Sequence, residues 1–184
     1  MNNSPLTALP VSRAVSELGI HAGTLTTITL WHDFLCPWCY VGLIQAEKLI
    51  VQYDVSFDWR GAELFPPALA FTPPSPKSAD PDAPAAPPSQ FDKFVESEGI
   101  VMPPRPPFLP MHNALLAAEY ATVTHGADAA HTFIAALYRG YWEKHEDISD
   151  HDVLQGYAEA QGLDAAPLLA SVAKDEFVAN ILDF

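Results

Sequence analysis

Residues 26–62, TTITLWHDFLCPWCYVGLIQAEKLIVQYDVSFDWRGA, decide how this chain folds. Side chains alternate over residues 26–31, so that Ile28 and Leu30 face one way and Thr27, Thr29 and Trp31 the other, which predicts a strand. The same alternation over residues 55–60, VSFDWR, predicts a second strand. Between them, apolar residues at helical spacing predict a helix that begins near Cys36. The stretch therefore predicts a strand–helix–strand unit with Cys-Pro-Trp-Cys at the junction of the first strand and the helix.

The motif Cys36-Pro37-Trp38-Cys39 has the spacing of a redox-active cysteine pair. Cysteines at positions i and i+3 of a first helical turn share one face, so their sulfurs are able to form a disulfide. Free amide N–H groups and the helix dipole favour the thiolate of Cys36, which predicts a pKa of about 3.5–7.5. Pro37 is tolerated at the first helical position, and Trp38 is expected to offer an exposed apolar contact to a substrate. We predict that Cys36 attacks a disulfide and that Cys39 resolves the mixed disulfide.

Two polar residues just before the cysteines are candidate supporting residues. Asp33 either accepts the proton of Cys39 during resolution, provided that burial raises its pKa, or caps the helix or faces water. His32 is a weaker candidate, because a histidine in this place is more often a polar group at a strand end. Tyr40 and Tyr141 are expected to pack in the core rather than to line a pocket.

A zinc site is the main alternative for the cysteine pair, because C-x-x-C also supplies half of a tetrahedral site. The chain has only two cysteines, so histidines would have to complete such a site. His32 is near in sequence, but the others are distant and have no zinc-finger spacing. Two unreactive buried cysteines are a further alternative. We therefore predict no metal and no resident cofactor.

The composition excludes several classes of function. Nine Lys and Arg against 23 Asp and Glu give a formal net charge of −14 over 184 residues. So acidic a chain repels phosphate groups and anionic lipid, which predicts neither a nucleic-acid nor a membrane partner. We find neither a run of about 20 apolar residues nor a secretory signal, and we expect a cytoplasmic protein. In a reducing compartment a purely structural disulfide is not expected.

The remaining chain divides into three regions. Residues 1–25 form a polar, irregular leader, with one short helix possible over 12–20. Residues 63–110 hold 14 of the 18 prolines, which predicts exposed loop with one short helix near 91–98. Residues 111–184 are predicted to be helical from their apolar stripes. The predicted helix boundaries there are a near capping box at Ser149 and Asp152, a stop at Gly162, and a start at Asp164 with Pro167 in the first turn.

Three segments carry a resemblance to a known family: ITLWHDFLCPWCYVGLIQAEKLI followed by VSFDWRGAELFP, then PPFLPMHNALLAAEYA, then FIAALYRGYWEKHEDISDHDVLQGYAEAQGLD. Together they resemble the DsbA-like branch of the thioredoxin superfamily, especially the FrnE-type oxidoreductases. The resemblance implies an α/β thioredoxin-like fold with a helical domain inserted after its second strand. Residues 26–62 would be the N-terminal half of the thioredoxin-like domain, and 111–184 the helical insertion.

The resemblance also implies thiol–disulfide exchange on thiol or disulfide substrates, with glutathione as a candidate redox partner. Glutathione-dependent isomerases and kappa-class transferases are kin, but they usually carry serine in place of Cys36, so redox chemistry is favoured here. A glutathione-dependent isomerase remains the alternative enzyme.

The sequence departs from the family pattern in its last part. The family has two return strands, the first preceded by a cis-proline, whereas here the only proline after Pro110 is Pro167. We therefore expect the C-terminal strands to be missing: either this is a truncated product, or another chain or the leader supplies the missing pairing. Two strands make a marginal sheet with an open edge, a candidate site of self-association into a homo-oligomer. A catalytically impaired binding module is accordingly a second alternative.

Overall fold

The computed structural model describes residues 26–66 and 87–182. In chain order the elements are β1 (Thr26–His32), α2 (Pro37–Gln52), β2 (Val55–Gly61), α3 (Gln90–Ser97), α4 (His112–His125), α5 (Ala127–Lys144), α6 (His151–Ala160), α7 (Ala165–Val172) and α8 (Val178–Leu182). The predicted strand–helix–strand unit, the short helix in the proline-rich region and the helices after residue 110 are confirmed. The short helix expected at 12–20 lies outside the described residues.

The two strands form a parallel pair, in register from Thr26 opposite Val55 to His32 opposite Gly61. A parallel pair needs a crossover connection, and α2 supplies it. The predicted alternation is confirmed, because the apolar side chains of β2 are buried while their neighbours are half-exposed. Within the described residues the sheet has no third strand.

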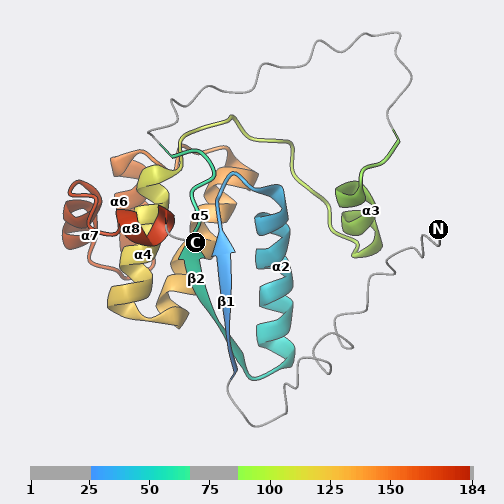
Figure 1. Ribbon diagram of the computed structural model, residues 1–184, viewed down its shortest axis with the longest axis horizontal. Helices are drawn as coiled ribbons and strands as arrows, with labels where there is room; N and C mark the ends of the chain where they lie inside the picture. Colours follow the sequence, from blue (N-terminus) through green and yellow to red (C-terminus); the bar gives the residue numbers. More distant parts are fainter. Residues whose placement is uncertain (1–25, 67–86, 183–184) are drawn as a thin grey trace.

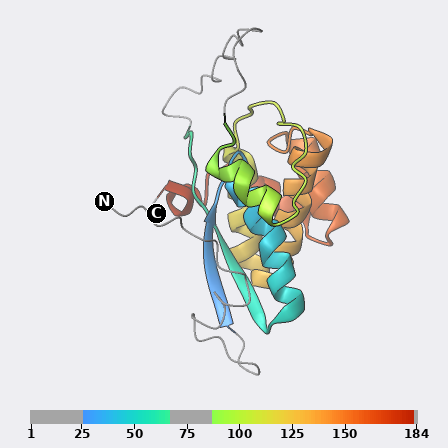
Figure 2. The same ribbon diagram turned by 90° about the vertical axis from the view of Figure 1, so that its right-hand side faces the viewer.

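Most of the helices lie on one face of this sheet. In Figure 2, α2 and the paired helices α4 and α5 lie on one side of the strands, and the short helix α8 lies on the other. In Figure 1, α2 lies next to β1, whereas α4 and α5 lie on the side of β2, and α6 and α7 lie farther from the strands. The core between the layers is aromatic and aliphatic, and its largest fully buried side chains include Trp59, Tyr138, Phe34, Phe133, Leu43 and Leu115.

The ends of the helices follow local capping chemistry, with one correction to the sequence prediction. α6 is capped by Asp150, whose carboxylate accepts the amides of Asp152 and Val153 at 2.9 and 3.2 Å, and not by Ser149. The Ser149 hydroxyl is occupied elsewhere, because it donates to the carbonyl of Pro110. The cap of α7 by Asp164 is confirmed.

Gly61 allows α8 to approach the end of β2. A β-carbon at Gly61 would lie 2.5 Å from the side chain of Ile181, closer than such atoms approach. The contact is held by a backbone bond in which Glu63 N–H donates to the Ile181 carbonyl at 3.0 Å. A glycine at this position therefore positions the last described helix against the sheet.

Candidate active site

The two cysteines lie where β1 turns into α2. Cys36 is the N-cap residue of α2, with an extended backbone, and Pro37 begins the helix. The Cys36 carbonyl accepts the amides of Cys39 and Tyr40 at 3.1 and 3.2 Å, which closes the first helical turn over the motif. Both cysteines are free thiols and half-buried. The sequence prediction of this local geometry is confirmed.

Cys36 sits in surroundings that favour its thiolate. A hydrogen bond from the Cys39 thiol is the main reason that the pKa of Cys36 falls to about 6. The backbone amides of Cys39 and Trp38 lower this pKa further, while burial and the charge of Asp33 oppose them. Near neutral pH most Cys36 is therefore ionised, and the thiolate is the nucleophilic form. The amide contribution was expected from the sequence, whereas the larger contribution of the neighbouring thiol was not.

Cys39 has the opposite character. Its pKa is raised well above the ordinary range, first because its thiol donates to Cys36 and second because it is more deeply buried. Cys39 packs against the hydrophobic core, whereas Cys36 is not among the residues that do so. The pair therefore contains one ionised and one protonated sulfur, which is the arrangement that an attacking and a resolving cysteine require.

Asp33 lies below the cysteines, with only 2% of its surface exposed. Its carboxylate accepts the amides of Leu35 at 2.8 Å and of Leu64 at 2.9 Å. Burial nevertheless raises the pKa of Asp33, and the nearby Glu63 carboxylate adds to the rise. The alternative that Asp33 faces water is wrong, and α2 has no side-chain cap from Asp33 either, because its N-cap residue is Cys36. The condition for a proton-accepting role, a raised pKa close to Cys39, is met, while the role itself remains a proposal.

His32 is buried under the site rather than being a polar group at an exposed strand end. Its ring lies edge-on to those of Phe34 and Trp59, and burial lowers its pKa to about 3, so it is neutral. Its Nδ1 lies 3.0 Å from the hydroxyl of Tyr138, which donates to the Asp33 carbonyl at 3.2 Å. His32 therefore supports the backbone of the turn and does not reach solvent.

Helix α5 holds the turn between β1 and α2 in place. Besides Tyr138, its Trp142 donates from Nε1 to the carbonyl of Phe34 at 2.9 Å. The ring of Tyr40 stacks on Trp142 with the centroids 5.3 Å apart. The expectation that Tyr40 and Tyr141 pack in the core is confirmed. Two consecutive carbonyls of the turn, those of Asp33 and Phe34, are thus bound by aromatic donors from one helix.

Trp38 faces outward next to Cys36 and is 48% exposed, as expected. Part of its ring is covered by α3, because the ring centroids of Phe91 and Phe94 lie 4.9 and 5.5 Å from that of Trp38. Glu98, just after α3, accepts a hydrogen bond from Gln45 of α2 at 3.0 Å. An aromatic surface made of Trp38, Phe91 and Phe94 therefore borders the cysteine pair.

Sequence reasoning missed Tyr138 and Trp142, because both belong to the apolar stripe of α5. A signal was present, since a buried tyrosine or tryptophan needs a partner for its O–H or N–H group. It also missed Glu63, which is buried and bound to Nδ1 of His112 at 2.9 Å. Nothing in their spacing places Glu63 or His112 near the cysteines, because only the fold brings residues 33, 63 and 112 together.

Within residues 26–66 and 87–182, no three His, Cys, Asp or Glu side chains come together as a metal site would require. Among the same residues, no helix is both long and apolar enough to cross a bilayer. The cytoplasmic location expected from the sequence stays a prediction.

The sequence was compared with models of protein families. The family model of the DSBA-like thioredoxin domain matches residues 27–183. A curated relative, the uncharacterised protein YwbO of Bacillus subtilis (strain 168), is 27% identical over 140 residues, which are 76% of this chain and 68% of the relative.

Two solved structures have a similar fold. A 2-hydroxychromene-2-carboxylate isomerase superposes with a TM-score of 0.58 and 13% identity, over 85% of this chain and 77% of its own. A probable DsbA oxidoreductase from Streptomyces coelicolor superposes with a TM-score of 0.56 and 21% identity, over 84% and 72%. At these identities the likeness shows the fold alone, and it confirms the predicted α/β thioredoxin-like class. Since the family match spans most of the chain, this protein belongs to the DSBA-like thioredoxin domain family.

Proposed function

We propose that this protein is a thiol–disulfide oxidoreductase in which Cys36 is the nucleophile and Cys39 the resolving thiol. The observation that carries the proposal is the split between the two sulfurs, one with a pKa of about 6 and the other held protonated. Membership of the DSBA-like family supports the same chemistry.

The reaction proceeds in two exchanges. The Cys36 thiolate attacks one sulfur of a substrate disulfide, the S–S bond breaks, and the departing substrate sulfur takes up a proton from water. Cys39 then loses its proton and attacks the Cys36 sulfur, which releases the second substrate thiol and leaves a Cys36–Cys39 disulfide. Two electrons pass from the protein to the substrate. A low-molecular-weight thiol such as glutathione is the reductant that would restore the two thiols.

Asp33 is the group placed to accept the proton of Cys39. Its carboxylate is buried, its pKa is raised, and its charge acts on both cysteines. A carboxylate of raised pKa is a better base toward a thiol than an ordinary one. The aromatic surface of Trp38, Phe91 and Phe94 is the proposed contact for the apolar part of a substrate. We also place the chain in the FrnE-type branch, which the sequence around Cys36 favours.

The test follows the two cysteines separately. The reduced protein is mixed with a small peptide disulfide, and the products are identified by mass spectrometry. Wild type should end as the intramolecular disulfide and release two peptide thiols, because both exchanges proceed. Cys39→Ser should stop at a stable peptide adduct on Cys36, and Cys36→Ser should not react.

Two other outcomes contradict the proposal. If Cys39→Ser releases both peptide thiols as fast as wild type, the Cys36 of a second chain resolves the adduct and the resolving role of Cys39 is lost. A glutathione-dependent isomerase would be the better candidate if isomerase turnover were found and Cys39→Ser left it unchanged. If neither wild type nor Cys39→Ser reacts with the peptide disulfide, the protein is a binding module rather than an oxidoreductase.

A further inference from the structure

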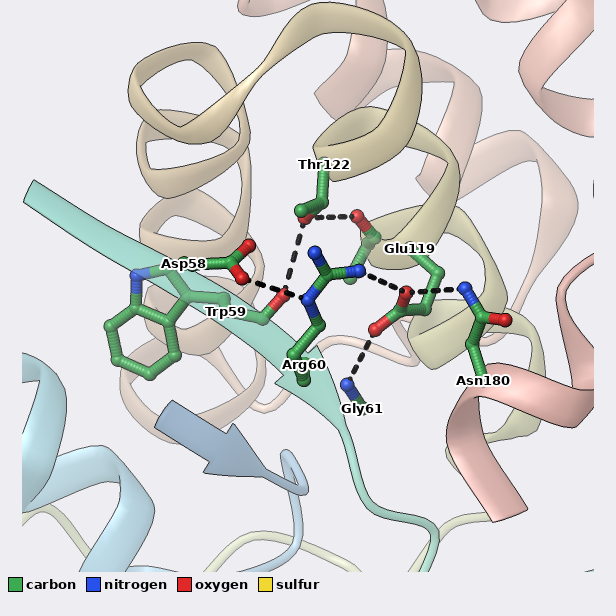
Figure 3. Close-up of polar contacts among 8 residues, drawn as sticks. Asp58, Trp59, Arg60, Gly61, Glu119, Thr122 and Asn180 are labelled. Atoms are coloured by element: carbon green, nitrogen blue, oxygen red, sulfur yellow. Dashed lines mark hydrogen bonds and ion pairs between the residues drawn. The ribbon is translucent and has the colours of Figure 1, made fainter. Parts of the chain in front are cut away.

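Side chains from the helices bind part of the outer edge of β2. Figure 3 shows the Glu119 carboxylate of α4 next to β2, where it accepts the amide of Gly61 at 2.7 Å. Asn180 of α8 donates to the same carboxylate at 3.1 Å, and the Thr122 hydroxyl donates to the carbonyl of Trp59 at 3.4 Å. Glu119 is 1% exposed. Two of the backbone groups that another strand would need on this edge, the amide of Gly61 and the carbonyl of Trp59, are therefore already bonded.

The outer edge of β1 has no such cover among the described residues. The Thr26 amide donates to Asp54, and the His32 carbonyl accepts from Ala62, so the even-numbered residues of β1 point toward β2. In a parallel ladder the alternate residues then point the other way. Thr27, Thr29 and Trp31 therefore direct their N–H and C=O groups outward, where residues 26–66 and 87–182 supply no third strand.

This open edge carries none of the features that keep an edge strand from pairing. Natural proteins protect such edges with charged residues, proline or a bulge. β1, TTITLWH, has no Lys, Arg, Asp, Glu or Pro, and its register with β2 runs without a bulge. Trp31 at its end is 56% exposed.

We propose that β1 pairs with β1 of a second copy of this chain. The two strands run antiparallel about a twofold axis at Thr29, so that Thr29 lies opposite its own copy and Thr27 lies opposite Trp31. In this register each outward residue faces another outward residue, and about six backbone hydrogen bonds form. The result is one four-stranded sheet in the order β2-β1-β1-β2. Such a sheet is more stable than the two-stranded sheet of a single chain.

The lack of charged residues in β1 and the side chains bound at the edge of β2 favour a dimer over other assemblies. A self-pairing through β1 places no charged residue opposite its own copy. The Asp58 and Arg60 side chains beside it on β2 are bonded to each other at 3.0 Å. Because Glu119 and Thr122 already bind the amide of Gly61 and the carbonyl of Trp59 on the β2 edge, we expect the pairing to end at two copies rather than to give an open chain of strands. The cysteine pairs follow the opposite ends of the two strands, so both stay accessible.

The twofold axis at Thr29 allows a test by charge reversal. Thr29→Lys and Thr29→Glu each place like charges directly opposite one another, and such pairs destabilise a strand pairing. We expect wild type to have twice the 20.0 kDa chain mass by light scattering, and each variant alone to be a monomer. An equimolar mixture of the two should recover the dimer, because lysine then faces glutamate. Thr29→Val, which keeps the amide and the charge, is the matched control and should stay dimeric.

Several outcomes overturn the proposal. The proposal is wrong if wild type stays monomeric over a hundredfold range of protein concentration. It is also wrong if the equimolar mixture of Thr29→Lys and Thr29→Glu stays monomeric like each variant alone. Hydrogen exchange gives a separate reading, because the amides of Thr27, Thr29 and Trp31 should gain protection only as the dimer forms. Equal protection of these amides in a monomer would mean that another segment of the same chain covers the edge. Disulfide exchange is not expected to change in these variants, so the two proposals fail independently.

Discussion

At Cys36 the low pKa depends first on the hydrogen bond from Cys39 and only then on the amides of the helix. This order of causes can be tested by titrating the rate of alkylation of Cys36 against pH. For wild type we expect the half-maximal rate near pH 6. Cys39→Ala removes the donor and should move the midpoint upward toward the ordinary thiol value of about 8.5. Cys39→Ser keeps a hydroxyl donor, so its midpoint should lie between the two. A midpoint that is unchanged in Cys39→Ala would show that the helix amides alone set the pKa.

At the scale of elements, α5 supports the active-site turn through the side chains of Tyr138 and Trp142. The Tyr138 hydroxyl binds both the Asp33 carbonyl and Nδ1 of His32 in a fully buried place. Tyr138→Phe would leave both groups without a partner, and we expect the free energy of unfolding to fall by about 1–3 kcal/mol in urea denaturation. The matched control is Tyr141→Phe on the same helix, whose hydroxyl donates to the Pro107 carbonyl in a partly buried place. A loss in Tyr138→Phe no larger than in the control would contradict the support that we assign to α5.

For the whole molecule, the buried His32 couples stability to pH. Its pKa is lowered from 6.5 to about 3 by burial, so below pH 6.5 the unfolded chain binds a proton that the folded chain does not. Stability should therefore fall as pH decreases from about 6.5 toward 3, with a slope of up to about 1.4 kcal/mol per pH unit from this group. His32→Gln keeps a donor toward Tyr138 but does not titrate, and its unfolding free energy should lose this part of the slope. Identical slopes in the two proteins would mean that His32 is not buried in its neutral form.

Much of the local structure follows from the sequence because it depends on neighbours in the chain. Alternation of side chains located both strands, and the position of Pro37 and the cysteine spacing located the start of α2. Where two local signals competed, the sequence did not decide between them. Ser149 and Asp150 are both good capping residues, and Asp150 caps α6 because the carbonyl of Pro110, distant in sequence, binds the Ser149 hydroxyl.

The sequence alone determined the Cys-Pro-Trp-Cys motif, the strand–helix–strand unit that presents it and the fold class, because these depend on residue types at short spacing. The tertiary structure decided the burial of His32 and Asp33, the support of the turn by Tyr138 and Trp142, and the partial closing of one sheet edge by Glu119. These features join residues about 30 to more than 100 positions apart. No local pattern encodes such a contact, since it arises only when the helices pack on the sheet and exclude water from the groups between them.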